Sequence, residues 1–256
     1  METTMSDAAT ALQASSAQLR ALVEPLDAEQ LRAPAYPTEW TVADVLSHMG
    51  SGADIFVRQV NDAVAGSPTP PDFSRSVWDD WNARTPEAQA AGVLASDAAL
   101  LTRLEELTPE ERGNVTISMG PFTLNFDQYL GLRLNEHVLH TWDVDVTFND
   151  DAVIPVEDVE AVLDNLGFVA RFAAKPSGAE RTYLVRTSDP VRAYEISLTP
   201  EAVTTVETEN DASADLELPA EAFIRLVYGR LDADHTPPDV ADNEHLEELR
   251  KVFPGF

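Results

Sequence analysis

The chain has 256 residues, which is long enough for one large folded domain or two modest ones. Its content of 44% hydrophobic and 24% charged residues is ordinary for a globular protein. Its 45 acidic residues against 17 Lys and Arg give a net charge of −28, a field that would repel DNA, RNA and anionic membranes. Cysteine is absent, which excludes disulfides, cysteine nucleophiles and thiolate-ligated metals, so any catalytic thiol must come from outside the chain.

Neither end nor middle of the sequence has the pattern of a membrane segment. No stretch approaches the roughly 18 apolar residues of a transmembrane helix, and the first seven residues lack the basic and apolar regions of a secretion signal. We therefore expect a cytoplasmic location, with no membrane and no nucleic acid as partner. The sequence does not indicate an oligomeric state.

The first part of the chain predicts four long helices, the number found in a four-helix bundle. Ser6 can cap the first helix. The second begins after Thr41, with Asp44 three residues on, which is close to a capping box. Pro86 opens the third helix, and the fourth runs over about residues 124–146.

The second helix places His48 at the edge of its apolar face. That face repeats at helical spacing over Val42, Leu46, Met49, Ala53, Val57 and Val60. A Pro-rich loop follows over residues 66–72, and then come Trp78 and Trp81. These two indoles either line a pocket or anchor the core.

After Pro155 the spacing of the apolar residues changes from the 3.6-residue period of helices to the two-residue period of strands. One more helix is followed by four short runs that alternate like strands, over residues 182–187, 193–198, 202–207 and 214–218. Helices are expected at 220–228 and 243–252. The fold class is thus a two-domain protein, with an all-α four-helix bundle at 1–150 and a small α+β domain with an antiparallel sheet at 151–256.

The clearest chemical signal is a pair of residues on the fourth helix. Glu136 and His140 are four residues apart, so both side chains leave the same face. His48 lies in a separate helix and could close a site from across the bundle. Two histidines, one carboxylate and no fourth ligand are the composition of a catalytic metal site with an open position. Taken singly, each is also compatible with an ordinary helix pair or a core histidine.

Neighbouring residues have more than one interpretation. Asp143 is a candidate to orient His140, although it could also be a cap or a solvated charge. His137 points about 100° away from Glu136 and is expected to lie outside the metal site. Arg133 shares the polar stripe of this helix and is a candidate cation for an acidic substrate.

Two segments of the sequence resemble a known family. Residues 39–48, Glu-Trp-Thr-Val-Ala-Asp-Val-Leu-Ser-His, resemble the helix start that carries the first metal histidine of the mycothiol-dependent maleylpyruvate isomerase family. Residues 133–143, with Arg-Leu-Asn-Glu followed by His and Asp, resemble its second motif. That family is a branch of the DinB-like metalloproteins. The C-terminal half, with Gly229-Arg230 and residues 252–256, resembles the sterol-carrier-like domain that the family appends.

The resemblance implies functional roles that the spacing alone does not give. It implies that His48, Glu136 and His140 bind a divalent metal, with zinc expected, and that the cosubstrate is a small thiol of the mycothiol type. It also implies that an arginine of the C-terminal domain takes part in catalysis, for which Arg230 is the candidate. An active site between the two domains is then expected, with Arg230 as a cation for an anionic substrate.

Three functions remain open at this point. The first is a metal-dependent enzyme with a thiol cosubstrate, an S-transferase or an isomerase acting on a small acidic substrate, since a metal in an open site deprotonates a bound thiol. Within it, Trp78, Trp81 and Arg133 are the candidates for binding the cosubstrate. The second is a metal-dependent hydrolase at the same site, since the metal also lowers the pKa of water. The third is a non-enzymatic protein that binds a small molecule or lipid.

Overall fold

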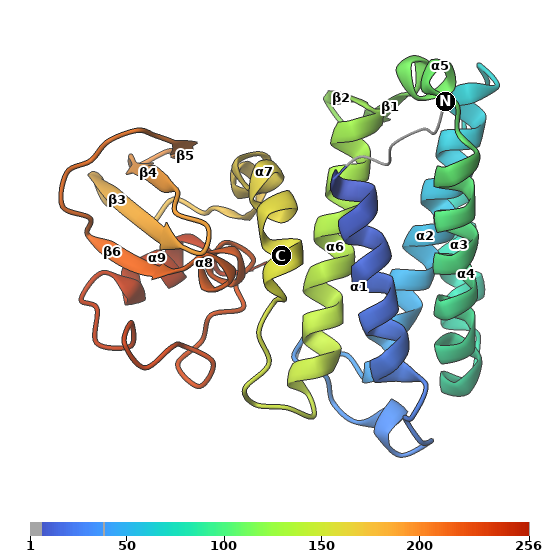
Figure 1. The fold of residues 1–256 in the computed structure, drawn as a ribbon, viewed down its shortest axis with the longest axis horizontal. Coiled ribbons are helices and arrows are strands. Elements are labelled where there is room, and N and C mark those ends of the chain that lie inside the picture. Colours follow the sequence, from blue (N-terminus) through green and yellow to red (C-terminus); the bar gives the residue numbers. More distant parts are fainter. Residues whose placement is uncertain (1–6, 38, 256) are drawn as a thin grey trace. The chain divides into compact units, whose positions relative to one another are not determined.

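The protein folds into two compact units, Met1–Ala152 and Val153–Phe256. The computed structural model describes residues 7–37 and 39–255, and Figure 1 gives the order of the elements. Ser6, the expected first cap, and Phe256, the end of the C-terminal segment, lie outside the described residues. The two units are described separately below.

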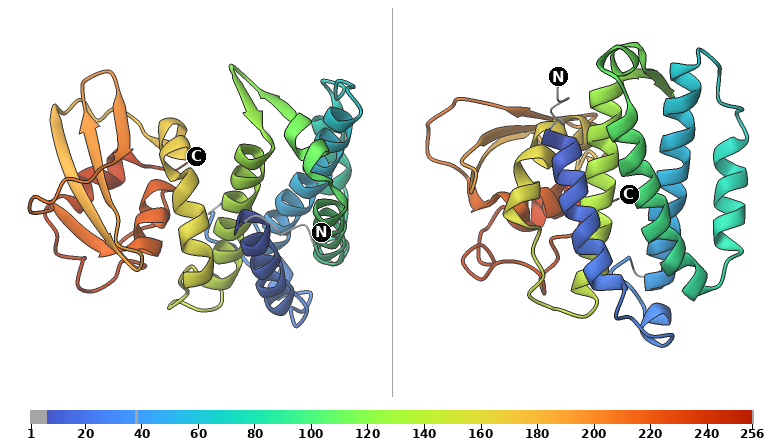
Figure 2. Two further views of the ribbon diagram at one scale, coloured as in Figure 1. Left: turned by 45° about the horizontal axis from the view of Figure 1, so that its top comes forward. Right: turned by 45° about the vertical axis from the view of Figure 1, so that its right-hand side comes forward.

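Within the described residues, the first unit contains four long helices, α1 (Asp7–Val23), α2 (Val42–Val64), α4 (Pro86–Glu106) and α6 (Phe126–Val146). Helix α2 packs against α4 and α6, and α1 packs against the same two helices, so that the four surround one core (Figures 1 and 2). This is the predicted four-helix bundle.

The helices begin where the sequence supplies caps. The Thr41 side chain accepts a hydrogen bond from the backbone N–H of Asp44, and the Asp44 carboxylate accepts one from the N–H of Thr41, so the predicted capping box is complete. Asn125 and Gln128 form the same arrangement at the start of α6. Both helices that carry the candidate ligands therefore have a fixed first turn.

The apolar face predicted for α2 is buried. Five of its six positions are fully enclosed among the described residues, namely Val42, Leu46, Met49, Ala53 and Val60. The opposite side of the helix faces away from this core. A residue at the edge of the apolar stripe therefore lies between core and solvent and is partly exposed. His48 occupies that edge and is partly exposed.

Several short elements of the first unit were not predicted. They are a 3₁₀ turn (Gln30–Arg32), α3 (Phe73–Asn82), α5 (Pro109–Asn114), and a hairpin of β1 (Thr116–Met119) and β2 (Phe122–Asn125). Gly120 turns the hairpin with a φ of 57°, which a side chain would strain. Helix α3 lies against α2 on the outside of the bundle (Figure 2), where it contributes to the site described below.

The second unit is α+β, as predicted. Its elements are α7 (Val156–Ala173), β3 (Arg181–Ser188), β4 (Ala193–Leu198), β5 (Val203–Glu207), β6 (Leu216–Pro219), α8 (Ala220–Val227) and α9 (Leu246–Val252). Within residues 153–255 the sheet has four strands in the order β5-β4-β3-β6. Helix α7 packs against β5 and α8. Along β4, Tyr194, Ile196 and Leu198 alternate inward, which explains the period of two in the sequence.

One strand departs from the expected antiparallel sheet. Strands β3, β4 and β5 pair antiparallel, but β6 pairs with β3 in parallel, with Val185 opposite Leu216. After β5 the chain crosses to the other edge of the sheet instead of turning back in a hairpin. The sheet is therefore mixed, and this direction was not predicted, because alternation reveals a strand but not its partner.

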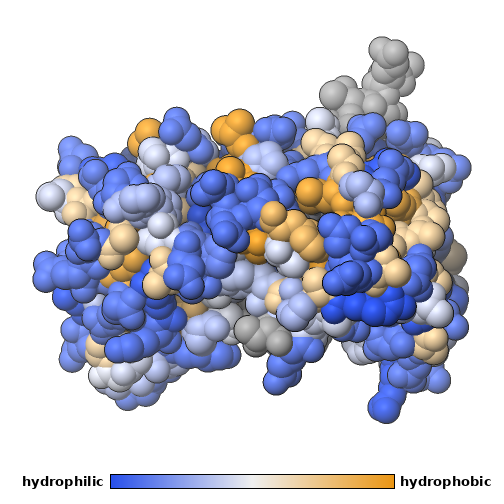
Figure 3. Space-filling model, turned by 90° about the horizontal axis from the view of Figure 1, so that it is seen from below, coloured by the Kyte–Doolittle hydropathy of each residue, from blue (hydrophilic) through white to orange (hydrophobic). Residues whose placement is uncertain are grey.

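Charged and polar side chains are prominent on the face of the molecule seen in Figure 3. On the face in Figure 3 hydrophilic residues cover most of the area, and hydrophobic side chains form only small patches between them. This agrees with the net charge of −28. Among the described residues, no helix combines the length and the apolar character needed to cross a membrane.

Candidate metal centre

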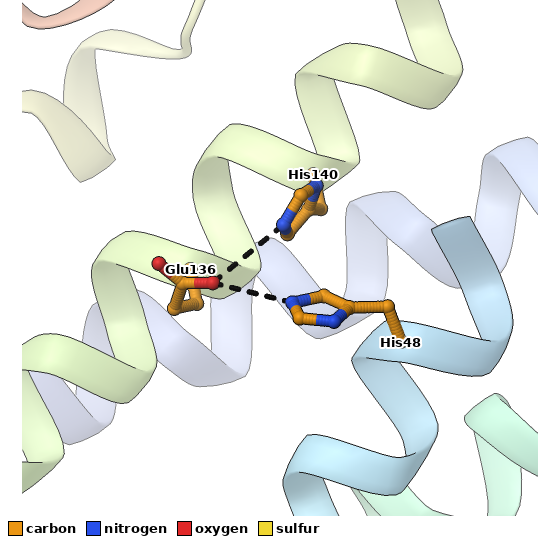
Figure 4. A group of neighbouring side chains, drawn as sticks. All are labelled: His48, Glu136 and His140. Carbon is orange, nitrogen blue, oxygen red and sulfur yellow. Dashed lines mark hydrogen bonds and ion pairs between the residues drawn. The ribbon is translucent and has the colours of Figure 1, made fainter. Parts of the chain in front are cut away.

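Three side chains from two helices meet at the edge of the bundle. His48 comes from α2, while Glu136 and His140 come from α6, one turn apart (Figure 4). The Oε2 atom of Glu136 lies 3.3 Å from Nε2 of His48 and 3.6 Å from Nε2 of His140. The structure thus brings together the three residues expected as ligands.

The spacing of these atoms suits a metal ion. One ligand atom from each residue lies within 4.8 Å of the other two. A tetrahedral zinc ion with ligands about 2.1 Å away holds them about 3.4 Å apart, close to the two distances above. The imidazole nitrogen is a borderline donor and the carboxylate oxygen a hard donor, and zinc accepts both. The donor set therefore fits a divalent metal with its fourth position open.

Two further residues fix the imidazole of His140. Its Nδ1 lies 2.8 Å from Oδ2 of Asp143, the hydrogen bond expected from the sequence, which leaves Nε2 directed at Glu136. The indole of Trp40 lies 5.3 Å from the ring of His48 and 6.1 Å from the ring of His140, centre to centre. Trp40 therefore covers one side of both histidines and restricts their rotation.

The electrostatics favour a cation at this point. Burial alone would raise the pKa of Glu136, but hydrogen bonds from His140 and His48 outweigh it and hold that pKa well below its usual range. Burial alone would lower the pKa of His140, but Asp143 and Glu136 together raise it above 6.5. The Glu136 carboxylate is therefore ionised, and a divalent cation between it and the two imidazoles would be attracted by this charge.

A surface cavity of about 340 Å³ opens beside His48. Its walls combine one stripe of α2, one stripe of α3 and the loop before α2; the described residues that line it are Glu39, Trp40, Asp44, His48, Ser51, Trp78 and Asn82. Trp78 is 48% exposed, so one face of its indole is open to a ligand. The structure thus places Trp78 where the sequence suggested a pocket wall.

Trp81 lies elsewhere, in the core between α2 and α4. It is 1% exposed, and its Nε1 donates a hydrogen bond to Asp54 at 2.8 Å. Its ring packs directly on Gly50 and Gly92, one glycine from each long helix. Trp81 is not among the described residues that line the cavity, and it has the position of a core anchor.

Arg133 is likewise not among the described residues that line the cavity. Its side chain is 6% exposed, and Nη2 donates to Oδ1 of Asp97 at 3.1 Å. Asp97 in turn bonds Nε2 of His137 at 2.9 Å, and Nδ1 of His137 lies 2.8 Å from the hydroxyl of Ser15. This buried cluster joins α1, α4 and α6. His137 lies outside the metal site, as expected.

Arg230 belongs to the second unit. It follows α8, where its backbone N–H donates to the carbonyl of Arg225 at 2.7 Å and its Nη1 donates to the carbonyl of Tyr228 at 2.9 Å. Gly229 precedes it with a φ of 70°, the left-handed conformation typical of a helix end. The predicted part of Arg230 in catalysis stays a prediction.

Part of the cavity was not predicted from the sequence. Asp44 was interpreted as a helix cap on the same side of the helix as His48, four residues before it, but not as part of a cavity wall. Trp40 and Asn82 were not among the predicted site residues, and α3, which carries Asn82, was not predicted. The spacing of Trp78 and Asn82, four residues apart, would have been the signal for this second wall.

The chain is similar to known proteins in sequence and in fold. Residues 12–145 match the family model of the mycothiol maleylpyruvate isomerase N-terminal domain, a segment that contains all three candidate ligands. Among solved structures, the crystal structure of mycothiol-dependent maleylpyruvate isomerase aligns with a TM-score of 0.65 and 16% identity, covering 87% of this chain and 88% of that chain. A histidine-to-alanine mutant of that enzyme aligns with a TM-score of 0.64 over the same shares.

The structural likeness extends beyond the first unit, since 87% of the chain is more than residues 1–152 contain. At 16% identity it shows the fold, and it confirms the predicted combination of a helical bundle with a small α+β part. No functionally curated protein matches the chain. Because the family model covers more than half of the sequence, the chain belongs to the mycothiol maleylpyruvate isomerase family, as its two motifs indicated.

Proposed function

We propose that the protein is a metal-dependent enzyme that uses a small thiol as cosubstrate, with isomerisation as the reaction that its family favours and S-transfer as the second possibility. The observation that carries the proposal is the convergence of His48, Glu136 and His140 at distances that suit one metal ion. Zinc is the expected metal. The printed names of the family and of the similar structures support a thiol of the mycothiol type.

The metal, when bound, would supply a positive charge that lowers the pKa of a coordinated thiol and so yields a thiolate at neutral pH. The remaining work falls to the side chains. Glu136 is ionised over the whole neutral range, since its pKa is low. Asp143 holds His140 with Nε2 directed at the site, and Trp40 shields both imidazoles on one side. The open side of His48 faces the cavity, where the thiol would enter.

An acidic substrate would require a cation that the cavity does not supply. Arg133, one of the two arginines considered for this role, is committed to Asp97 in the core. Arg230 therefore remains the candidate for binding the carboxylate of a substrate, a task for which a guanidinium is better suited than an ammonium. The proposal retains a cytoplasmic location, where small thiols are kept reduced.

The test combines metal content with thiol dependence. Purified protein should contain about one equivalent of divalent metal per chain by elemental analysis, and turnover of an unsaturated oxo acid should require added thiol. Turnover of an ester or amide without any thiol would favour the hydrolase. Full metal content in the His48→Ala/His140→Ala double variant would contradict the ligand set.

A further inference from the structure

We propose that a groove between α1 and α4 is a further binding site, for a small uncharged molecule with an apolar body and one hydroxyl or carbonyl group. The groove has a volume of about 240 Å³. Among the described residues, it shares no lining residue with the cavity beside His48, and no candidate metal ligand lines it. The inference therefore does not rest on the proposed function.

The groove is built from two matching stripes, one on each helix. The stripe of α1 runs from Gln13 to Arg20 and that of α4 from Leu94 to Leu101, and in both the lining residues recur three, four and seven positions after the first. At one end Nη2 of Arg20 donates to the carbonyl of Leu94 at 3.5 Å, which joins the stripes. Seven residues of helix rise about 10.5 Å, so the groove accepts a group of about that length.

An unpaired hydroxyl group lies at the base of this groove. Ser16 and Asp97 are the buried members of the two stripes, whereas Ala17 and Ala98 are exposed and form its sides. Ser16 is 9% exposed, and its Oγ has no hydrogen-bond partner among the described residues. Buried polar atoms are nearly always paired, because an unpaired one is unfavourable. A ligand with one hydroxyl or carbonyl group would supply the missing partner.

The charged groups of the groove are already paired with opposite charges. Nη1 of Arg20 lies 3.2 Å from Oε1 of Glu24. The two carboxylate oxygens of Asp97 lie 3.1 Å from Nη2 of Arg133 and 2.9 Å from Nε2 of His137. A charged ligand would thus have to displace one of these partners, whereas an uncharged one would not. The apolar sides and the paired charges together favour an uncharged ligand.

The experiment titrates full-length, isotope-labelled protein with four small probes and follows the backbone amides by heteronuclear NMR. Benzyl alcohol and ethylbenzene have nearly the same shape and differ in the hydroxyl group, while benzylamine and benzoate carry a positive and a negative charge. Benzyl alcohol should shift amide signals along the facing stripes of α1 and α4. Benzylamine and benzoate should bind more weakly than benzyl alcohol, because neither charge finds a free partner at the base of the groove.

The contribution of the Ser16 hydroxyl is measured as a ratio of dissociation constants. Benzyl alcohol and ethylbenzene differ in hydration, so their affinities are compared in wild type and in Ser16→Ala. The dissociation constant of benzyl alcohol divided by that of ethylbenzene should be about fivefold higher in Ser16→Ala, because only the alcohol loses a hydrogen bond.

A matched pair of variants tests the location of the site. Ala98→Leu fills the groove and should weaken the binding of every probe that wild type binds. Ala99→Leu adds the same side chain at a neighbouring exposed position that does not line the groove, so its affinities should equal those of wild type. Both alanines are exposed, and circular dichroism confirms that each variant is folded.

Each outcome decides one part of the proposal. Shifts along both helices that disappear in Ala98→Leu and persist in Ala99→Leu support the site, and a higher ratio in Ser16→Ala supports hydrogen bonding by Ser16. No shifts up to the solubility limit of the probes, or shifts confined to other elements, would overturn the site. An unchanged ratio would overturn recognition through Ser16, and tighter binding of benzylamine or benzoate would overturn the uncharged class. Since no readout involves the metal, failure here leaves the proposed function standing.

Discussion

Helix α6 carries two histidines three residues apart, and their surroundings are opposite. His137 is fully buried, with Ser15 at one ring nitrogen and Asp97 at the other. His140 also has a carboxylate at one ring nitrogen, with Asp143 at Nδ1, but its Nε2 meets Glu136, whose side chain is 46% exposed. Burial lowers the pKa of His137 despite Asp97, whereas Asp143 and Glu136 raise the pKa of His140 against burial.

Both clusters combine histidine with a carboxylate, so the presence of these residue types does not separate a structural site from a chemical one. What separates them is whether a ring nitrogen is directed at a position that an outside ligand can reach. The closed cluster of Ser15, Asp97, Arg133 and His137 contributes to stability. The open cluster of His48, Glu136 and His140 is the one that we propose binds a metal.

The strongest test of the closed cluster is Asp97→Ala. Removing this carboxylate leaves the Arg133 guanidinium buried without its partner, which typically costs about 3–5 kcal/mol. We expect chemical denaturation to show a loss of free energy of unfolding in that range, with metal content unchanged while the protein is folded. Asp97→Asn, which keeps a hydrogen-bonding group, should cost less. Loss of metal from folded Asp97→Ala would show that the two clusters are not independent.

In the open cluster, His140→Ala should lower the affinity for metal, whereas Asp97→Ala in the closed cluster should lower stability. Removing one of three ligands should weaken metal binding by at least about 100-fold, because the group found among the described residues has no fourth ligand to compensate. Competition with a chelating dye measures the affinity, and His245→Ala serves as a control in the second unit. Unchanged affinity in His140→Ala would show that the metal, if bound, lies elsewhere.

The hydrogen bond from His140 to Asp143 should have an intermediate effect. Carboxylates that orient a metal-bound histidine typically contribute about 10- to 100-fold to metal affinity. Asp143→Asn should therefore bind metal more weakly by this factor, and Asp145→Asn, two residues further on the same helix, should not. Equal affinities in the two variants would mean that Asp143 acts on the fold alone.

The buried His137 should make the protein sensitive to acid. Its folded-state pKa is lowered, so below about pH 6.5 the unfolded chain takes up a proton that the folded protein does not, and stability falls by up to about 1.4 kcal/mol per pH unit. His140, with a raised pKa, acts in the opposite direction in metal-free protein. The measured quantity is therefore the difference between wild type and His137→Gln, which should shrink as the pH falls from neutral to about 5.5. A constant difference would contradict the buried, neutral state of His137.

The smallest expected effect concerns the second unit. If Arg230 binds an anionic substrate, Arg230→Ala should raise KM by up to about tenfold while metal content and melting temperature stay the same. Arg186→Ala, on strand β3, is a matched control. Unchanged kinetics would limit the chemistry to the first unit and would assign Arg230 to the structure of its own unit.

The parts that could be predicted are those in which one residue spacing decides the outcome. Glu136 and His140 share a face in any helix with about 3.6 residues per turn. The apolar stripe of α2 likewise predicted which side of that helix is buried. His48 was a candidate for the same site as a histidine on a separate helix, but spacing does not show which helices meet, so its assignment rested on the family resemblance. The mixed sheet and the position of Arg133 depended on long-range pairings, with β3 and Asp97 respectively, that the local sequence does not contain.

The short helix α3, which was not predicted, shows again that contacts between elements cannot be derived from the local sequence. Its two tryptophans were equally eligible as pocket walls, and the structure assigns them opposite places, Trp78 at the surface and Trp81 in the core. They are three residues apart on the helix, so their directions differ by about 60°. Only knowledge of where α3 contacts α2 decides which indole is enclosed.

The contact between Trp81 and Gly50 also links tolerance to mutation with the shape of the cavity. A Cβ atom at Gly50 would lie 2.1 Å from Cη2 of the indole, so even alanine would force ring and helix apart. Gly50 touches no ligand, yet it lies two residues after His48 and sets how closely α3 approaches. Evolution could therefore widen or narrow the entrance of the cavity by changing a residue that never meets the substrate. The two glycines that accommodate the indole, Gly50 and Gly92, determine how closely α3, the outer wall of the cavity, packs on the bundle.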